Sequence, residues 1–210
     1  MCAKIEIVAV TPDCEAVIEQ AGCTCYQSAS RTGPDSKKNF IRKIIENGHH
    51  SVLEHASATF KIKGVSRSFT HQFVRHRLCA FSQRSQRYVN EKSFSFVEPE
   101  SIREKTEAHK LFEEFMAEAK NTYCKLQELG IKNEDARFVL PNAVQSKIVL
   151  SANFRELRHI FCVRCDRRAQ WEIRNIVLQM LRILKKEAPS VFGDFIIDEE
   201  MGIACTPFPS

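Results

Sequence analysis

The chain has 210 residues, of which 43% are hydrophobic and 27% are charged, and this composition is that of a soluble globular protein able to bury a core. Lys and Arg together outnumber Asp and Glu by 31 to 26, which gives a formal net charge of +5. No apolar run is long enough to span a membrane, and the first apolar run is too short and too charged for a secretory signal. We therefore expect a cytoplasmic protein without a membrane partner.

Hydrophobic periodicity predicts a mixture of strands and helices along the whole chain. Strands are expected at residues 4–10, 56–62, 94–97 and 148–154, and a turn at 30–36. Helices are expected at residues 13–21, 37–47, 65–78, 101–129 and 133–140, then after 154 and at 170–186. Gly48 and Gly130 are expected to end two of these helices, and Ser101 with Glu104 fits a capping box.

These elements predict one α+β domain covering residues 1–210, with mixed helices around a small, largely antiparallel twisted sheet. Alternation along the strand at 148–154, extended by one residue, places Ser151, Asn153 and Arg155 on one polar face. In the last helix, six apolar residues at helical spacing form the predicted buried face: Ile173, Ile176, Val177, Met180, Leu181 and Leu184.

Nine cysteines in a chain without an export signal are expected to be reduced thiols. Two close pairs, Cys23 with Cys25 and Cys162 with Cys165, leave a metal or redox site open as an alternative. A common zinc site needs a second C-x-x-C or a His pair at finger or ribbon spacing, which this sequence lacks. We therefore expect no metal.

The charges are unevenly distributed along the chain. Residues 55–90 contain no Asp or Glu but several Lys and Arg, and a second group of Arg runs from Arg155 to Arg174. The planar fork of Arg suits carboxylate and phosphate, so an anionic ligand is expected, with a solvated basic face as the alternative.

The most informative segment lies at residues 72–88. Gln72, Arg75 and His76 are spaced at i, i+3 and i+4, which places them on one face of the predicted helix at 65–78. A turn near Ala80 and an irregular polar loop at 82–87 are expected to follow. Basic groups would converge here without an acid to neutralise them, which is costly unless an anion binds. Phosphate-binding glycine loops and the common hydrolase motifs are absent, so side chains must hold any nucleotide.

This segment resembles the signature of the flavin-dependent (alternative) thymidylate synthases, which is Arg-His-Arg, seven residues, then Ser. Here Arg75-His76-Arg77 is followed after seven residues by Ser85, and Arg87-Tyr88 comes next. Three further blocks resemble the family in the same order, at residues 48–55, 136–141 and 153–173.

The resemblance implies an α+β subunit that assembles as a homotetramer and binds FAD, which NADPH reduces. It implies methylation of dUMP to dTMP, with 5,10-methylenetetrahydrofolate as the carbon donor and tetrahydrofolate as a product. It implies small-molecule partners and no nucleic acid.

Position by position, the resemblance also implies site residues. Those matched to dUMP binding are Gln72, Arg75, Gln83, Arg84, Ser85, Gln86, Arg87, Arg137 and Arg164. Those matched to FAD binding are Ser51, Arg75, His76, Arg77, Gln83, Asn153, Arg155 and His159. His49 and Tyr88 are candidate folate or nicotinamide contacts, with a loop-capping His and a core Tyr as the alternatives.

Arg164 is the candidate catalytic residue, because a fixed guanidinium against the N3–C4 edge of uracil would stabilise negative charge that develops there. Ser85 is expected to bind substrate and not to act as a nucleophile, since no His–Asp pair is visible to activate it. Three positions depart from the family pattern: Gln83 stands where some members have Glu, His159 where others have Asn, and Arg168 where members often have His.

A nucleic-acid-binding module is the competing interpretation. Aromatic residues within the acid-free stretch could form a stacking platform. They are Phe60, Phe69, Phe73, Phe81 and Tyr88. Against this interpretation, the Phe residues fall at core periods and the pI of 8.7 is mild for such a protein.

Overall fold

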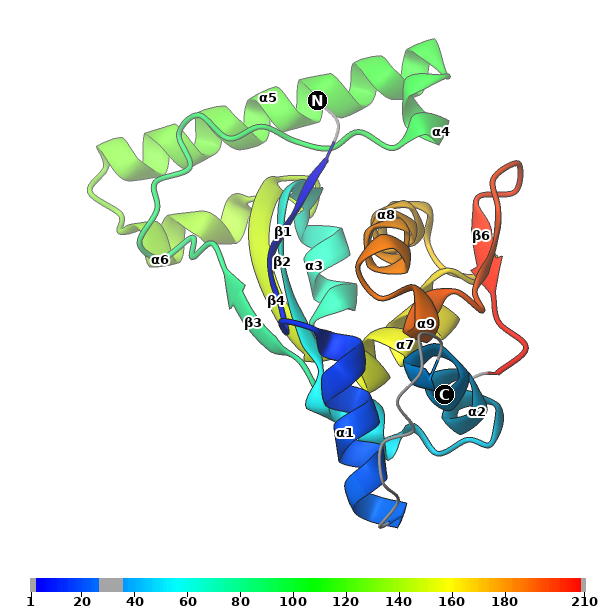
Figure 1. The fold of residues 1–210 in the computed structure, drawn as a ribbon. Coiled ribbons are helices and arrows are strands. Elements are labelled where there is room, and N and C mark those ends of the chain that lie inside the picture. Colours follow the sequence, from blue (N-terminus) through cyan, green and yellow to red (C-terminus); the bar gives the residue numbers. More distant parts are fainter. Residues whose placement is uncertain (1–2, 27–35, 209–210) are drawn as a thin grey trace. The chain divides into compact units, whose positions relative to one another are not determined.

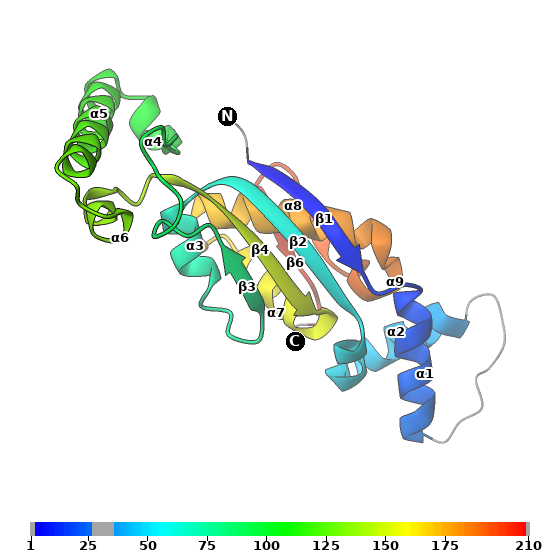
Figure 2. The ribbon, with the colours of Figure 1, turned by 90° about the vertical axis from the view of Figure 1, so that its left-hand side faces the viewer.

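The computed structural model describes residues 3–26 and 36–208, and it confirms an α+β fold. The larger sheet has four strands: β1 (Lys4–Val10), β2 (Ser57–Ser66), β3 (Ala80–Gln83) and β4 (Gln145–Asn153). Their order in the sheet is β1-β2-β4-β3 (Figures 1 and 2). A separate antiparallel pair, β5 (Ile196–Asp198) and β6 (Ile203–Cys205), places Ile197 opposite Ala204.

The chain divides into two compact units, each assembled from separate segments. Unit 1 is made mainly of Ile62–Gln72 and Ser82–Ile148, and unit 2 of Ile5–Lys61, Phe73–Phe81 and Val149–Ser210. Strands β2, β3 and β4 each contribute residues to both units. The single domain over residues 1–210 stays a prediction.

Unit 1 carries α4 (Glu100–Arg103), the long helix α5 (Thr106–Glu128) and α6 (Asn133–Ala136) (Figure 1). The short 3₁₀ helix η2 (Arg137–Val139) follows α6. Helix α5 buries Met116, which packs with Phe94 and Val144 in a small core. The helix predicted at 101–129 is interrupted after Arg103, and Ser101 lies inside α4, so the capping box is wrong. Gly130 follows α5 with φ +81°, a left-handed conformation that suits a helix end.

Unit 2 holds the helices α1 (Cys14–Tyr26), α2 (Ser36–Glu46), α7 (Phe154–Arg164), α8 (Trp171–Glu187) and α9 (Pro189–Phe192), with the 3₁₀ helix η1 (His50–His55). Helix α8 contacts both α7 and α9 (Figure 1). The six apolar residues predicted to form the inner face of α8 are all buried, so that prediction is confirmed. Gln170 caps α8 by accepting hydrogen bonds from the backbone N–H groups of Glu172 and Ile173.

Several element boundaries differ from the predictions. The helix expected at 65–78 is only α3 (Arg67–Phe73), and the irregular loop expected from residue 82 begins as strand β3. The strand expected at 94–97 is a single antiparallel bridge between Phe96 and Val144. Strand β4 ends at Asn153 and α7 begins at the next residue, so the polar strand face does not extend to Arg155. Most of the predicted turn, residues 30–35, lies outside the described residues.

Within residues 3–26 and 36–208, no helix combines the length and the apolar character that crossing a membrane requires.

Candidate functional site

Unit 2 brings together a group of side chains that we call the histidine cluster: His76, Cys79, Glu156, His159 and Arg164. His76 is buried in the turn after α3, and its Nε2 accepts a hydrogen bond from Arg164 Nε at 2.9 Å. On the other side of the ring, Nδ1 lies 3.6 Å from Glu156 Oε1. The Cys79 thiol also faces this oxygen, at 3.8 Å, and the His76 and His159 rings meet edge to face at 6.2 Å between centroids.

Burial and neighbouring cations control protonation in the histidine cluster. Burial, followed by the charges of Arg164 and His159, lowers the pKa of His76 to about 4, so its imidazole is neutral at neutral pH. Burial raises the pKa of Glu156, while the charge of His159 and a hydrogen bond from Cys79 oppose this shift. Burial, and then the charge of Arg75, lowers the pKa of Arg164, yet a guanidinium stays protonated in proteins.

The local sequence explains how α7 carries this cluster. Asn153 is the N-cap of α7, and its side-chain oxygen accepts a hydrogen bond from the backbone N–H of Glu156 at 2.9 Å. Leu157, Ile160 and Phe161 are buried and fix the helix against the core. Arg164 therefore projects from the last turn of a helix that is anchored at its start and along its inner face.

Other predicted FAD-binding residues of unit 2 lie at the surface. Ser51 is exposed in η1, and Arg155 is exposed and pairs with Glu54 at 2.5 Å. Arg75 and Arg77 are exposed, and neither forms an ion pair with any residue that the structure describes. These two guanidinium groups can therefore bind an anion without first breaking an ion pair with a carboxylate of the described residues.

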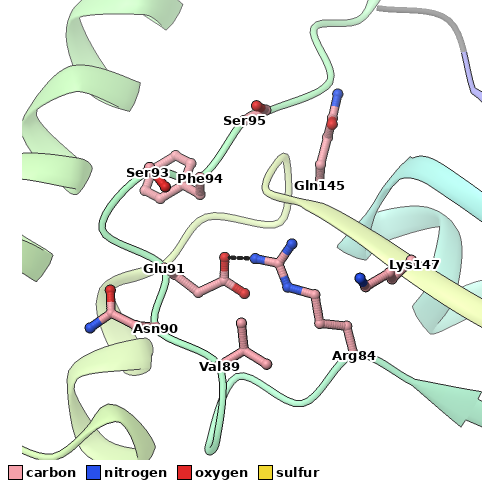
Figure 3. A pocket seen from close by; sticks show the side chains of 9 residues that line it. All are labelled: Arg84, Val89, Asn90, Glu91, Ser93, Phe94, Ser95, Gln145 and Lys147. Atoms are coloured by element: carbon pink, nitrogen blue, oxygen red, sulfur yellow. Dashed lines mark hydrogen bonds and ion pairs between the residues drawn. The ribbon is translucent and has the colours of Figure 1, made fainter.

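Unit 1 carries the second group, which we call the arginine loop (residues 84–91). Arg84 pairs with Glu91, whose side chain is 1% exposed (Figure 3). The backbone N–H of Glu91 donates to the buried Tyr123 hydroxyl at 3.2 Å, which holds the loop against α5. Arg84 Nε is buried and has no hydrogen-bond partner among the residues that the structure describes. The Arg84–Glu91 pair lines a pocket of about 330 Å³ together with Gln145 and Lys147 (Figure 3).

The remaining predicted dUMP-binding residues of unit 1 are also engaged in contacts. Arg87 pairs with Glu134 at 2.9 Å, and Arg137 Nε donates to the Glu134 carbonyl oxygen at 3.0 Å. Gln83 donates to Thr70 Oγ1 at 2.8 Å.

The other residues predicted to contact dUMP, the folate or the nicotinamide differ in their hydrogen bonds and in their exposure to solvent. Ser85 Oγ accepts from the backbone N–H of Arg87, and Gln72 donates weakly to the Ser68 carbonyl at 3.5 Å. Gln86 is buried, whereas Tyr88 is 80% exposed, so the core position considered for Tyr88 is wrong. His49 is exposed just before η1.

The structure corrects two expectations about the segment at 72–88. Gln72, Arg75 and His76 do not share a helix face, because α3 ends at Phe73. The basic groups are not without acids either: Glu91 pairs with Arg84, Glu134 pairs with Arg87, and Glu156 lies beside His76. All three acids lie outside residues 55–90, so an acid-free stretch of sequence does not give an acid-free site.

Sequence reasoning missed two buried carboxylates, Glu91 and Glu156. Glu156 carried a signal, because it stands three residues after Asn153 in the spacing of a capped first helical turn. Glu91 carried a weaker one, as the first acid after the acid-free stretch.

The two competing interpretations find little support in these surroundings. Phe60, Phe69 and Phe73 are completely buried, so they cannot form a stacking platform for bases. Cys165 is also buried, and burial raises the pKa of its thiol to about 12. Among the described residues, no three His, Cys, Asp or Glu side chains gather as a metal site would require.

Comparison with known proteins identifies the family. Residues 6–190 match the family model described as thymidylate synthase complementing protein. A flavin-dependent thymidylate synthase of Geobacter sulfurreducens is 44% identical over 199 residues, covering 91% of this chain and 86% of the relative. The enzyme of the same name from Pyrococcus abyssi is 45% identical, and the match covers 76% of this chain and 67% of the relative. The one from Corynebacterium glutamicum is 40% identical, and the match covers 88% of this chain and 80% of the relative. The resemblance read from the Arg75-His76-Arg77 segment is thereby confirmed, and the chain belongs to the thymidylate synthase complementing protein family.

Proposed function

We propose that this protein is a flavin-dependent thymidylate synthase that converts dUMP to dTMP, with 5,10-methylenetetrahydrofolate as the carbon donor and NADPH as the reductant of FAD. Family membership and the names of the relatives support the flavin-dependent synthase activity. The observation that carries the proposal is the hydrogen bond from Arg164 Nε to the buried His76 in unit 2, which holds the guanidinium in place.

The donors of unit 2 fit FAD. Arg75 and Arg77, which form no ion pair within residues 3–26 and 36–208, offer guanidinium groups for its pyrophosphate, and Ser51 and the exposed His159 offer further donors. Asn153 uses its side-chain oxygen as the helix cap, which leaves its amide nitrogen to donate. Arg155 would exchange its surface contact with Glu54 for the cofactor. When bound, FAD supplies hydride transfer, while the chain supplies binding and orientation.

The residues of unit 1 suit a nucleotide monophosphate. Arg84, Arg87 and Arg137 offer forked, charge-assisted hydrogen bonds to a phosphate, and the buried Arg84 Nε has no hydrogen-bond partner in the described part of the chain. Neutral donors accompany these cations, at Gln72, Gln83, Ser85 and Gln86. We assign these side chains to dUMP, and His49 and the exposed Tyr88 to the folate or the nicotinamide.

Arg164 is the residue we assign to substrate activation. Its hydrogen bond to His76 fixes the plane of the guanidinium before substrate binds. A cation held in this way can stabilise negative charge on the N3–C4 edge of uracil and favour loss of the N3 proton. Such preorganised donors commonly lower a barrier by about 3–4 kcal/mol.

We also propose that the protein is a homotetramer whose sites draw residues from more than one subunit. Large apolar side chains are exposed beside predicted site residues, including Tyr88 at 80% and Phe138 at 83%. Subunit contacts would remove such side chains from water. Light scattering should give a mass near four chains, and a strictly monomeric mass would contradict the assembly.

The test of function combines cofactor retention with product formation. Denatured protein should release FAD into a filtrate, and the native protein should form dTMP from the three substrates. Arg164→Ala should abolish dTMP formation while FAD binding survives, and Arg164→Lys should be strongly impaired because it keeps the charge but loses the planar fork. As a control, Arg182→Ala removes an α8 residue that pairs with Glu199 at the surface, and it should keep near wild-type turnover. Near wild-type turnover in Arg164→Ala with saturating dUMP would refute the activating role.

A further inference from the structure

We propose that Glu156 is a positioning residue, which holds His76 in the tautomer that accepts the Arg164 hydrogen bond and so fixes the orientation of Arg164. The positions of Glu156, His76 and Arg164 in the histidine cluster support this role. Its consequence for turnover rests on the function proposed above.

The hydrogen bond between Arg164 and His76 determines the tautomer. Arg Nε can only donate, so His76 Nε2 must present its lone pair, and a neutral imidazole must then carry its proton on Nδ1. Nδ1 lies 3.6 Å from Glu156 Oε1, which is an electrostatic contact and not a direct hydrogen bond. The proton of the required tautomer therefore sits on the side of the ring where the carboxylate lies.

Glu156 is well placed to act on that proton. Its side chain is 6% exposed, so little water competes for the interaction. The group lies in the first turn of α7, where the helix dipole favours a carboxylate. The Cys79 thiol also donates to Oε1, and burial raises the pKa of this thiol to about 12, so it stays a donor.

Removing the carboxylate should change the His76–Arg164 contact in a defined way. In the other neutral tautomer, Nε2–H would face Arg164 Nε–H, and two donors would repel each other. Arg164 would then have to rotate away. A Gln at 156 has the same shape but no charge, and its amide can accept from Nδ1 or donate to it, so its effect should be intermediate.

The direct test is the tautomer of His76, observed with ¹⁵N-histidine labelling and long-range ¹H–¹⁵N correlation at neutral pH. His76→Gln identifies the signal by its loss. We expect the wild type to carry its proton on Nδ1 alone, Glu156→Leu to shift it toward Nε2, and Glu156→Gln to give a mixture. Glu172→Gln is the matched control, because Glu172 is also 6% exposed but lies in α8, and it should leave the tautomer unchanged.

The turnover number of the Glu156 variants is the second measurement that tests the proposal. In Glu156→Leu, Arg164 should lose its hydrogen bond to His76, and kcat for dTMP formation should therefore fall roughly tenfold or more, as expected when a charged group loses a hydrogen bond. FAD content and the KM for dUMP should stay near wild type. Glu156→Gln should restore part of the loss, and it remains informative if the Leu variant does not fold.

The two proposals fail in different ways. A wild-type His76 protonated on Nε2, or an unchanged tautomer in folded Glu156→Leu, would overturn the positioning role whatever the activity. A shifted tautomer with unchanged kcat would overturn the claim that Arg164 depends on it. A tautomer that responds as expected in a protein making no dTMP would support the positioning and refute the proposed function.

Discussion

Asp194→Asn should destabilise unit 2 strongly, because it would leave Arg158 buried without its counter-charge. Arg158 is completely buried, and its two terminal nitrogens each lie 2.7 Å from an Asp194 carboxylate oxygen. The same guanidinium donates to the carbonyl oxygens of Val191 and Phe208 and lies over the Phe195 ring at 4.9 Å. Arg158 belongs to α7, so this contact network anchors the helix that carries Arg164.

The magnitude follows from the asymmetry of buried ion pairs. Removing one partner of such a pair typically costs about 3–5 kcal/mol, a large share of the roughly 5–15 kcal/mol that stabilises a domain. Replacing both partners, as in Arg158→Met with Asp194→Leu, removes the uncompensated charge and should recover much of the loss. Glu199→Gln is the control, because its pair with Arg182 is exposed and such pairs contribute about 0–1 kcal/mol.

Urea unfolding followed by fluorescence of Trp171, the only tryptophan in the sequence, measures these differences in unfolding free energy. Burial alone would raise the pKa of Asp194, but hydrogen bonds from Arg158 and Thr206 outweigh it and lower that pKa. The contribution of the pair is therefore present at neutral pH and lost only as the pH falls through the depressed pKa. A shift for Asp194→Asn no larger than that for Glu199→Gln would refute this reasoning.

Three further outcomes are expected. The pKa of His76 is about 4 in the folded protein and 6.5 in its ordinary state, so the unfolded chain binds this proton first as the pH falls. The unfolding free energy should therefore fall by roughly 3 kcal/mol between pH 6.5 and 4. Urea unfolding of His76→Gln at several pH values should lack this pH dependence. Glu91→Gln should lower the urea midpoint by an amount equivalent to about 2 kcal/mol, since Arg84 loses its carboxylate but keeps some contact with water; an unchanged midpoint would show that the pair is not needed. A thiol reagent should modify the exposed Cys205 quickly and the buried Cys165 only on unfolding, which peptide mapping by mass spectrometry can check.

Apolar spacing was the most reliable guide to the fold. Strand β1 has the predicted bounds, and the buried face of α8 contains every residue assigned to it. In α8 the buried apolar face is large enough for the helical period to dominate local preferences, whereas in β1 the prediction followed from the alternation alone, since no residue of that strand is fully buried. Gly48, with φ +71°, ends α2 as predicted, because this backbone conformation favours glycine.

The helix predicted at 65–78 shows where the same method fails. Val65, Phe69 and Phe73 are all buried and fit a helical spacing of four, but Val65 lies in β2 and the helix stops at Phe73. Beyond that point the apolar side chains of Val74 and Leu78 are 38% and 78% exposed, so they do not bury a further helical turn. Tertiary packing decides this boundary, and the spacing of apolar residues alone does not contain it.

Ion pairing separates the arginines of the candidate site into two classes. Arg84, Arg87 and Arg155 each hold a carboxylate contributed by a residue outside the acid-free stretch, so an anionic ligand must displace or share that partner. Arg75 and Arg77 have no such partner in the described part of the chain, and a ligand meets their charge directly. The sequence places all five among basic neighbours, and only the fold distinguishes arginines already neutralised within the chain from those still able to bind an anion.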